Sequence, residues 1–274
     1  MCDALPMTES RGDWRARLQT DRPHSARVWN YLLGGKDHYP VDSETGDLIL
    51  SAFPEIAAIA RQQRAFLRRS VRFLAQEAGV RQFLDIGTGL PTADNTHEVA
   101  QRIAPDSRIV YVDNDPIVLA HAEVLMRSTP DGACAYLDAD VRDTDRILAR
   151  AADTLDFTRP VGLVLLGIIG QLSDDEDPAR VVRELTAALP RGSYVALSDG
   201  TDTSETLKTA IAAYNGQSAN SYHLRPAHQI ESFFDGLRLL DPGLVKTGHW
   251  RPDLSTAPTA PEEGYAVCGV GIKE

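Results

Sequence analysis

The chain has 274 residues, the length of one large domain or of one domain with an appendage. Its 28 Lys and Arg against 39 Asp and Glu give a net charge of −11, with 43% hydrophobic and 24% charged residues, which excludes a collagen, a coiled coil and wholesale disorder. This acidity disfavours nonspecific binding to nucleic acid or anionic lipid.

The cysteines and the apolar runs predict a cytoplasmic protein. The 3 cysteines are scattered, without a CxxC pair, and the N-terminus carries acidic residues where a secretion signal needs an apolar stretch. The longest apolar run, residues 161–172, is too short to cross a membrane. We therefore expect reduced thiols and no membrane partner.

The first third of the chain predicts a tail and a helical cap. Residues 1–22 are polar and without pattern, so we expect a flexible tail. Residues 23–80 form the predicted cap, with helices over 25–33, 47–60 and 61–78. In the third helix an arginine face lies opposite the apolar stripe; it is either a solvated surface or a docking surface for an anionic or macromolecular substrate. That face consists of Arg61, Arg64, Arg68 and Arg72, with Arg69 beside it.

Residues 81–274 predict a single α/β domain. Five short apolar runs alternate with helical stretches, which is typical of a parallel sheet wound with crossover helices. The runs are 82–86, 108–112, 133–137, 161–166 and 193–198, and the helices lie near 92–103, 115–128, 142–153 and 177–189. Two more runs, 237–240 and 265–272, are joined by a Pro-rich loop without a helical pattern, so they form an antiparallel hairpin. The expected fold is a doubly wound, mostly parallel sheet of seven strands.

A glycine turn follows the first strand. Gly87 and Gly89 allow the backbone to approach a ligand, and the next helix offers unpaired N–H groups. Such a turn alone is a weak signal. A dinucleotide fingerprint needs a third glycine where this chain has Thr92, and the carboxylate of Asp85 opposes a pyrophosphate. NAD or FAD is therefore disfavoured.

Three acidic residues follow the first three strands. Asp85 suits an ammonium group, Asp113 can accept both hydroxyls of a ribose, and Asp140 can accept from an adenine amino group. Each residue alone could be a plain helix cap. In one register along a βαβαβ unit, they predict a site for adenosine joined to a cationic amino acid, which is S-adenosylmethionine.

The sequence resembles the superfamily of S-adenosylmethionine-dependent methyltransferases with a seven-strand, Rossmann-like fold. More narrowly, it is similar to a bacterial family of S-adenosyl methyltransferases common in actinomycetes. The resemblance runs from about residue 23 to the C-terminus and rests on residues 25–37, 83–92, 111–116 and 236–252. Within the first of these stretches, RVWNYLLGGKD (residues 27–37) is specific to the narrow family.

The resemblance implies a set of cofactor-binding residues and a lid. It implies a cradle for the cofactor, a ribose contact, an adenine contact and a methyl-donor side. In that order these are Asp85, Gly87, Thr88 and Gly89; Asp113 and Asn114; Asp140 and Val141; Gly167 and Ile168. Residues 30–39 would fold over the cofactor as a lid.

The chain departs from the family pattern at possible bases. Relatives often carry histidines where this chain has Gly170 and Asp199, and an aspartate in place of Asn30. A methyl acceptor that loses a proton would then need another base, and each candidate has a plain alternative as a surface or packing residue. The candidates are Tyr31, His38, Tyr39, Asp199, Tyr222 and His223. The histidine and cysteine spacing predicts no metal site.

Three functions remain open at this point. The first is a methyltransferase acting on a small molecule, since the net charge of −11 makes nucleic acid the least favoured acceptor. The second is a protein that binds S-adenosylmethionine or S-adenosylhomocysteine without catalysis, which the missing histidines motivate. The third, an NAD-linked oxidoreductase, is disfavoured by Thr92 and Asp85.

Overall fold

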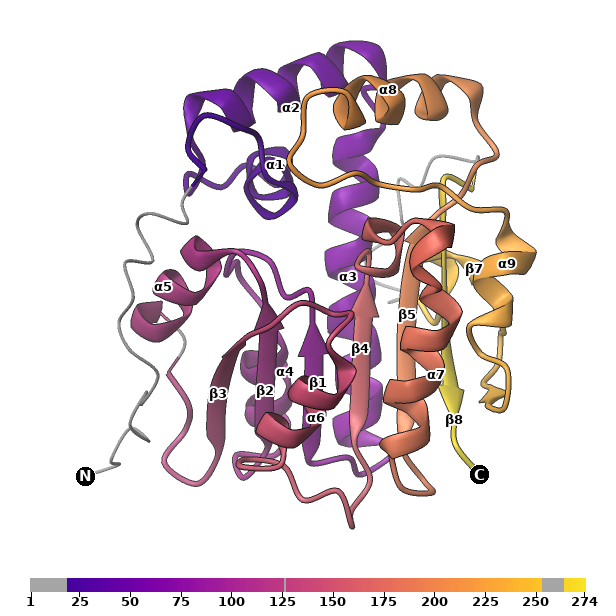
Figure 1. Cartoon of the computed structure of the whole chain (residues 1–274). Coiled ribbons are helices and arrows are strands. Elements are labelled where there is room, and N and C mark those ends of the chain that lie inside the picture. Colours follow the sequence, from indigo (N-terminus) through magenta and orange to yellow (C-terminus); the bar gives the residue numbers. More distant parts are fainter. Residues whose placement is uncertain (1–18, 126, 253–263) are drawn as a thin grey trace.

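A single sheet organises the chain (Figure 1). The structure is a computed structural model that describes residues 19–125, 127–252 and 264–274, so most of the predicted tail and part of the Pro-rich loop lie outside it. The strand order is β3-β2-β1-β4-β5-β8-β6, and β7 also pairs with β8. The bounds are β1 Gln82–Ile86, β2 Arg108–Asp113, β3 Ala133–Asp138, β4 Gly162–Leu166, β5 Tyr194–Gly200, β6 Arg238–Leu239, β7 Val245–Lys246 and β8 Ala266–Ile272.

The predicted fold class is confirmed, with one more strand than expected. Strands β1 to β5 are parallel neighbours, and β8 runs antiparallel to β5, β6 and β7. The predicted antiparallel pairing of the last two runs appears between Arg238 and Ile272. The eighth strand is the two-residue β7, which lies inside the stretch expected to be loop.

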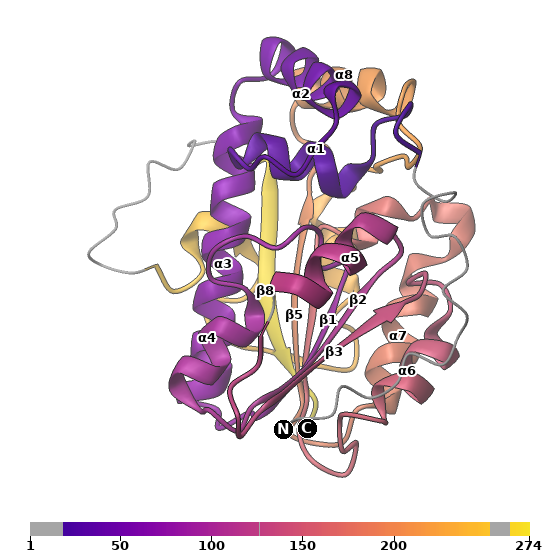
Figure 2. The ribbon, with the colours of Figure 1, turned by 90° about the vertical axis from the view of Figure 1, so that its left-hand side faces the viewer.

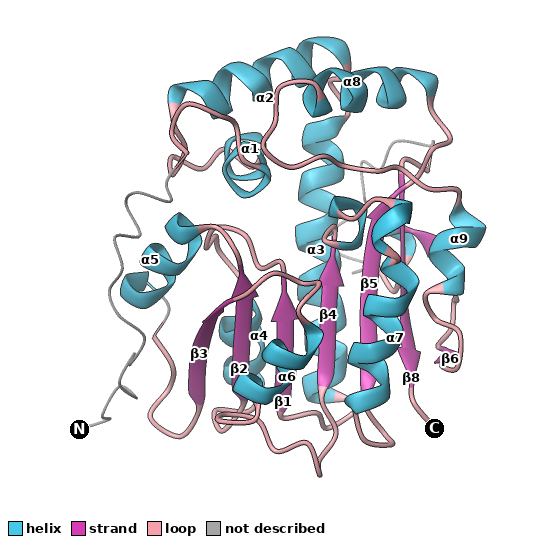
Figure 3. Ribbon diagram, in the orientation of Figure 1, coloured by secondary structure: helices cyan, strands magenta, loops and turns pink. Residues whose placement is uncertain are grey.

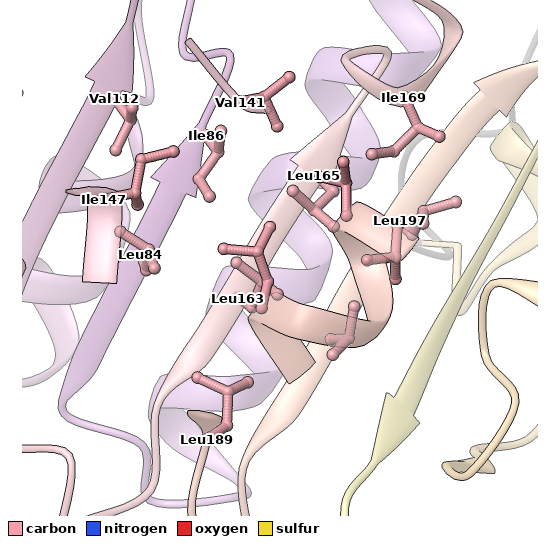
Figure 4. Packing of buried hydrophobic residues seen from close by; sticks show 14 of the residues in the cluster. Leu84, Ile86, Val112, Val141, Ile147, Leu163, Leu165, Ile169, Leu189 and Leu197 are labelled. Atoms are coloured by element: carbon pink, nitrogen blue, oxygen red, sulfur yellow. The ribbon is translucent and has the colours of Figure 1, made fainter. Parts of the chain in front are cut away.

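Helices cover both faces of the sheet (Figures 2 and 3). On one face lie α3 (Ile56–Gln76) and α4 (Thr96–Ile103); on the other lie α6 (Thr144–Ala151), α7 (Pro178–Ala188) and α9 (Ala227–Ser232). Helix α5 (Pro116–Leu125) follows β2. Side chains alternate along a strand, so Leu84 and Ile86 pack towards α6 (Figure 4), whereas Phe83 packs against α3 and α4. Asp85 shares the face of Phe83.

The first two long helices begin and end elsewhere than predicted. Helix α1 is Ser25–Leu32, close to expectation, but α2 is Pro40–Ala52 and α3 begins at Ile56. The chain breaks at Phe53 and Pro54 because proline has no N–H and clashes with a preceding helical turn. The predicted boundary near residue 60 is therefore wrong.

The layer above the sheet contains a helix that the sequence did not reveal. Helix α8 (Glu205–Asn215) follows β5 and packs beside α2 at the top of the molecule (Figure 1). Its Leu207, Ala210 and Tyr214 join one buried cluster with residues of α1, α2 and the start of α3. We call α1, α2, the first turns of α3, and α8 the cap helices.

Candidate functional site

A cavity of about 730 Å³ is lined by residues of the cap helices and of the carboxyl ends of the parallel strands. All residues that the sequence assigned to the cofactor line it: Asp85, Gly87, Thr88, Gly89, Asp113, Asn114, Asp140, Val141, Gly167 and Ile168. Binding at the carboxyl edge of such a sheet is the general rule for doubly wound folds. The structure thus brings the predicted cofactor residues together.

The glycine turn after β1 has the backbone that its sequence requires. Gly87 and Gly89 have φ values of 73° and 66°, in the left-handed region that favours glycine. A Cβ on Gly87 would lie 2.7 Å from the Ile168 side chain, whereas a Cβ on Gly89 would meet no atom within 4 Å. Because Gly89 also lines the cavity, its backbone leaves open space for a ligand.

Asp113 holds the glycine turn in place. Its Oδ2 accepts the N–H of Gly89 at 2.8 Å, and its Oδ1 accepts the N–H of Asp115 at 3.0 Å. Burial raises the pKa of Asp113, while these two hydrogen bonds lower it. Each carboxylate oxygen can accept a second donor, so the residue still offers acceptors to a pair of hydroxyls.

Asp85 is a buried carboxylate beside the same turn. Its side chain is 6% exposed, and its Oδ2 accepts the hydroxyl of Thr96, the first residue of α4, at 2.6 Å. Burial raises the pKa of Asp85 to about 6, against the opposing effects of Thr96 and of the Arg64 charge. A cationic ligand group in the cavity would favour the ionised carboxylate.

Asp140 has a partner that the sequence did not suggest. Arg142 donates from Nε to Oδ1 of Asp140 at 2.7 Å and from Nη2 to Oδ2 at 2.6 Å, and it also pairs with Glu176. The hydrogen bonds from Arg142 hold the pKa of Asp140 below its usual value. Arg142 and Glu176 line the cavity as well, so an adenine at this edge would meet an ion-paired carboxylate.

The arginine face of α3 divides between the cavity, the core and the surface. Arg64 lines the cavity, and its Nη2 donates to the carbonyl of Ala93 at 3.1 Å. Arg69 is 6% exposed and donates to the carbonyls of Trp250 and Thr247. Arg64 lies three residues before Leu67, which belongs to the apolar stripe. Because residues three apart share a helix face, this spacing could have predicted that Arg64 faces inward.

Two of the candidate bases, Tyr222 and Asp199, form a buried pair. Tyr222 lines the cavity and donates its hydroxyl to Oδ1 of Asp199, while the hydroxyl oxygen of Tyr222 accepts the N–H of Gly200 at 3.1 Å. Burial raises the pKa of Asp199 to about 6 and that of Tyr222 well above its usual range. Asp199 itself is 2% exposed and does not line the cavity.

The tyrosine ring also explains Gly170. A Cβ at Gly170 would lie 2.5 Å from Cζ of Tyr222 and 2.7 Å from Oδ1 of Asp199. The space beside residue 170, where the family resemblance led us to look for a histidine, is therefore filled by the ring of Tyr222.

The other candidate bases are placed differently. His223 lines the cavity, and its backbone N–H donates to the carbonyl of Gly170 at 2.7 Å. Tyr31, His38 and Tyr39 do not line it. Tyr31 donates to Asp47 and stacks edge-on against His38, and Tyr39 lies under the guanidinium of Arg27. Of the predicted lid, residues 30–39, Asn30, Leu32 and Leu33 line the cavity.

The part of the chain that the structure describes has neither a metal-binding cluster nor a membrane-spanning helix. Within residues 19–125, 127–252 and 264–274, no three His, Cys, Asp or Glu side chains are grouped to hold a metal ion. In those ranges no helix has the length and apolar character that crossing a bilayer requires.

The fold and the site define a class: a doubly wound α/β protein with a glycine turn and strand-end carboxylates around a nucleoside-sized cavity. The family model of the S-adenosyl methyltransferases matches residues 11–274, and the chain belongs to that family. Both the family and the superfamily resemblance expected from the sequence are confirmed.

Related proteins agree with this placement. A DUF574 family protein from Streptomyces avermitilis is 43% identical, with a TM-score of 0.88 over 93% of this chain and 99% of that one. A protein from Thermobifida fusca, proposed to be a methyltransferase, is 37% identical with a TM-score of 0.86 over 97% and 100%. The carboxy-S-adenosyl-L-methionine synthase of Chromohalobacter salexigens is 25% identical in an alignment of 193 residues that covers 68% of this chain; the chain spans 63% of that curated relative.

Proposed function

We propose that the protein is a cytoplasmic methyltransferase that uses S-adenosylmethionine and acts on a small-molecule acceptor. The observation that carries the proposal is one cavity that joins the strand-end carboxylates and glycine turn to a chamber beneath the cap helices. Membership of the S-adenosyl methyltransferase family supports the choice of cofactor.

The residues around the turn fit the groups of this cofactor. Its ammonium, ribose hydroxyls and adenine amino group are all hydrogen-bond donors, and the cavity offers them the carboxylates of Asp85, Asp113 and Asp140. The open space at Gly89 leaves room for the cofactor next to the turn. Gly167 and Ile168 line the side of the cavity where the methyl group would lie. A 2′-phosphate would be repelled by Asp113, which argues against NADP.

The cofactor supplies a methyl group that its sulfonium charge already activates, so the protein must align the acceptor and accept one proton. Alignment alone can lower a barrier by roughly 7–11 kcal/mol. We assign the proton to the Tyr222–Asp199 pair. An acceptor proton would pass to the Tyr222 oxygen as the phenolic proton passes to Asp199, which ends as a neutral acid. The pKa of Asp199, raised by burial to about 6, suits a base that works near neutral pH.

The buried apolar lining and the net charge support a small acceptor. Val28 of α1 and Leu207 of α8 line the chamber and are 3% and 2% exposed. The net charge of −11 disfavours nucleic acid as the acceptor. The free thiols of Cys134 and Cys268 are compatible with a reducing compartment.

The test is turnover on a metabolite mixture. Purified protein is incubated with S-adenosylmethionine and a small-molecule extract, and S-adenosylhomocysteine release is followed over many equivalents. Sustained release supports the enzyme, and we expect Tyr222→Phe to lower it while the affinity for S-adenosylhomocysteine stays within about two-fold. Calorimetric titration with NAD is the second arm; preferential binding of NAD would refute the cofactor assignment.

A non-catalytic binding protein is the second candidate, favoured by the absence of histidines at Gly170 and Asp199. It predicts saturable binding of S-adenosylmethionine with no release of product from any extract, and Tyr222→Phe would then change nothing.

A further inference from the structure

The upper part of the cavity is an apolar chamber. Its walls come from all the cap helices and from the residues at the start of β8, and the same side chains form one of the buried hydrophobic clusters. They are Val28, Trp29, Leu32, Leu33, Ile49, Ile56, Ile59, Leu207, Ile211, Tyr214, Leu224, Tyr265 and Ala266. A ligand in this chamber would be surrounded by aliphatic and aromatic groups.

The charged and histidine side chains that line the cavity come from outside α1, α2 and α8. They are His24, Arg64, Asp85, Asp113, Asp140, Arg142, Glu176 and His223. Helices α1, α2 and α8 contribute no Asp, Glu, Lys, Arg or His to the described lining. A charged group placed between these helices would lose its hydration without gaining a partner.

Tyr222 supplies a polar group at one end of the chamber, in addition to the Asn30 and Tyr214 side chains that also line the cavity. The Tyr222 ring packs against the apolar cluster, while its hydroxyl lies between Asp199 and the N–H of Gly200. The apolar walls and the proposed proton acceptor therefore belong to one continuous space.

We infer that this chamber is the acceptor site, and that it takes an uncharged, largely apolar molecule with one hydroxyl or amine group at the Tyr222 end. The inference rests on the proposed function and narrows it from any small molecule to this class. Acceptors with a carboxylate, phosphate or permanent cation on the far side of the nucleophile are excluded by the same walls.

A matched pair of probes tests the class on the full-length protein loaded with S-adenosylhomocysteine. One probe is para-butylphenol, and the other is the same phenol with the terminal methyl replaced by a carboxylate. Calorimetry and Trp29 fluorescence measure binding, because Trp29 lines the chamber whereas Trp250 packs against Phe66 and Phe73. We expect the neutral phenol to bind saturably, to quench Trp29, and to bind at least about ten-fold more tightly than the carboxylate.

Variants on α8 locate the binding. Ile211 lines the chamber, whereas Ala213 on the same helix is exposed and does not. Ile211→Asp should weaken the neutral phenol about ten-fold or more and leave S-adenosylhomocysteine binding within about two-fold; Ala213→Asp should change neither. If Ile211→Asp does not fold, the conservative variant Trp29→Phe is used in its place. Trp29→Phe should abolish the fluorescence quenching, while calorimetry should still detect binding of the neutral phenol.

The outcomes separate the two proposals. Equal or tighter binding of the carboxylate, or binding of neither phenol to a protein that binds S-adenosylhomocysteine, overturns the acceptor class and leaves the cofactor assignment standing. Failure of S-adenosylhomocysteine itself to bind overturns the proposed function.

Discussion

The backbone N–H of Gly89 donates a 2.8 Å hydrogen bond to Oδ2 of Asp113, across 24 residues of sequence. The bond joins the turn after β1 to the last residue of β2, so the glycine turn and the strand-end carboxylate are one preorganised unit. A ligand that binds Asp113 meets a carboxylate whose orientation is already fixed.

Replacing Asp113 should therefore weaken cofactor binding. For Asp113→Ala we expect a loss of about 1.5–3 kcal/mol in the binding of S-adenosylhomocysteine, the usual range for hydrogen bonds to a charged group, measured by calorimetry. Asp138, which pairs in register with Asp113 on β3 but does not line the cavity, is the matched control. Equal effects of Asp113→Ala and Asp138→Ala would contradict the ribose role.

The glycine turn should tolerate a methyl group at one position better than at the other. Gly89→Ala adds only left-handed backbone strain, about 1–2 kcal/mol, because its Cβ meets nothing. Gly87→Ala adds the same strain and a contact of 2.7 Å with Ile168, so it should lower the free energy of unfolding further. Gly216, at φ −68° with no atom nearer than 3.6 Å to its Cβ, is the control, and Gly216→Ala should be neutral or stabilising. Urea unfolding measures the free energies of unfolding of the three variants. A smaller loss for Gly87→Ala than for Gly89→Ala would contradict this prediction.

Asp85 makes stability depend on pH in an unusual direction. Its folded-state pKa is about 6 and its unfolded value is near 3.8, so the native state binds more protons between these values. The free energy of unfolding of the ligand-free protein should fall as pH rises from about 4 to about 6. Asp199 acts in the same direction, so the difference between the native protein and Asp85→Asn isolates Asp85.

Urea unfolding at a series of pH values measures this slope. Asp85→Asn should flatten it, and an unchanged slope would show that the carboxyl is not held protonated by burial. A cationic ligand favours the ionised form, so the affinity for S-adenosylmethionine should rise through the same pH range in the native protein and much less in Asp85→Asn.

Two arginines on α3 should differ sharply in their effect on stability. Arg69 is buried and donates to the carbonyls of Trp250 and Thr247, each at 2.8 Å; Arg72 is exposed on the same helix. Arg69→Met leaves both carbonyls without this donor and should cost about 2–4 kcal/mol of unfolding free energy. Arg72→Met removes a surface charge and should cost less than about 1 kcal/mol. Similar losses of unfolding free energy in the two variants would contradict the prediction and indicate that both arginines are solvated.

The strands of the sheet were predictable because each is encoded by a short apolar run in its own sequence. Residues 82–86 and 162–166 are apolar runs bounded by turns, so their burial between two helix layers follows from composition. Helix α8 was not predictable, since its few apolar positions acquire meaning only beside α2. The two residues of β7 are strand only because β8 lies next to them.

That the glycine turn and the strand-end carboxylates line one cavity was predictable for the same reason, whereas the side-chain pairs elsewhere in the cavity were not. Asp85, Gly87 and Gly89 lie within one strand and its turn, where spacing sets geometry. Tyr222 reaches Asp199 from a loop 23 residues later, and Arg142 reaches Glu176 across 34. Such pairs depend on how distant segments dock, and no local pattern encodes that docking.

Because α8 follows β5, the glycine turn with its carboxylates and much of the apolar wall come from different segments of the sequence. The glycine turn and the strand-end carboxylates lie at the carboxyl ends of strands β1 to β3, whereas much of the apolar wall comes from the N-terminal helices and from a helix inserted after β5. If the chamber takes the acceptor as we infer, substitutions in those outer helices alone can change which acceptor is used, while the glycine turn and the carboxylates stay unchanged.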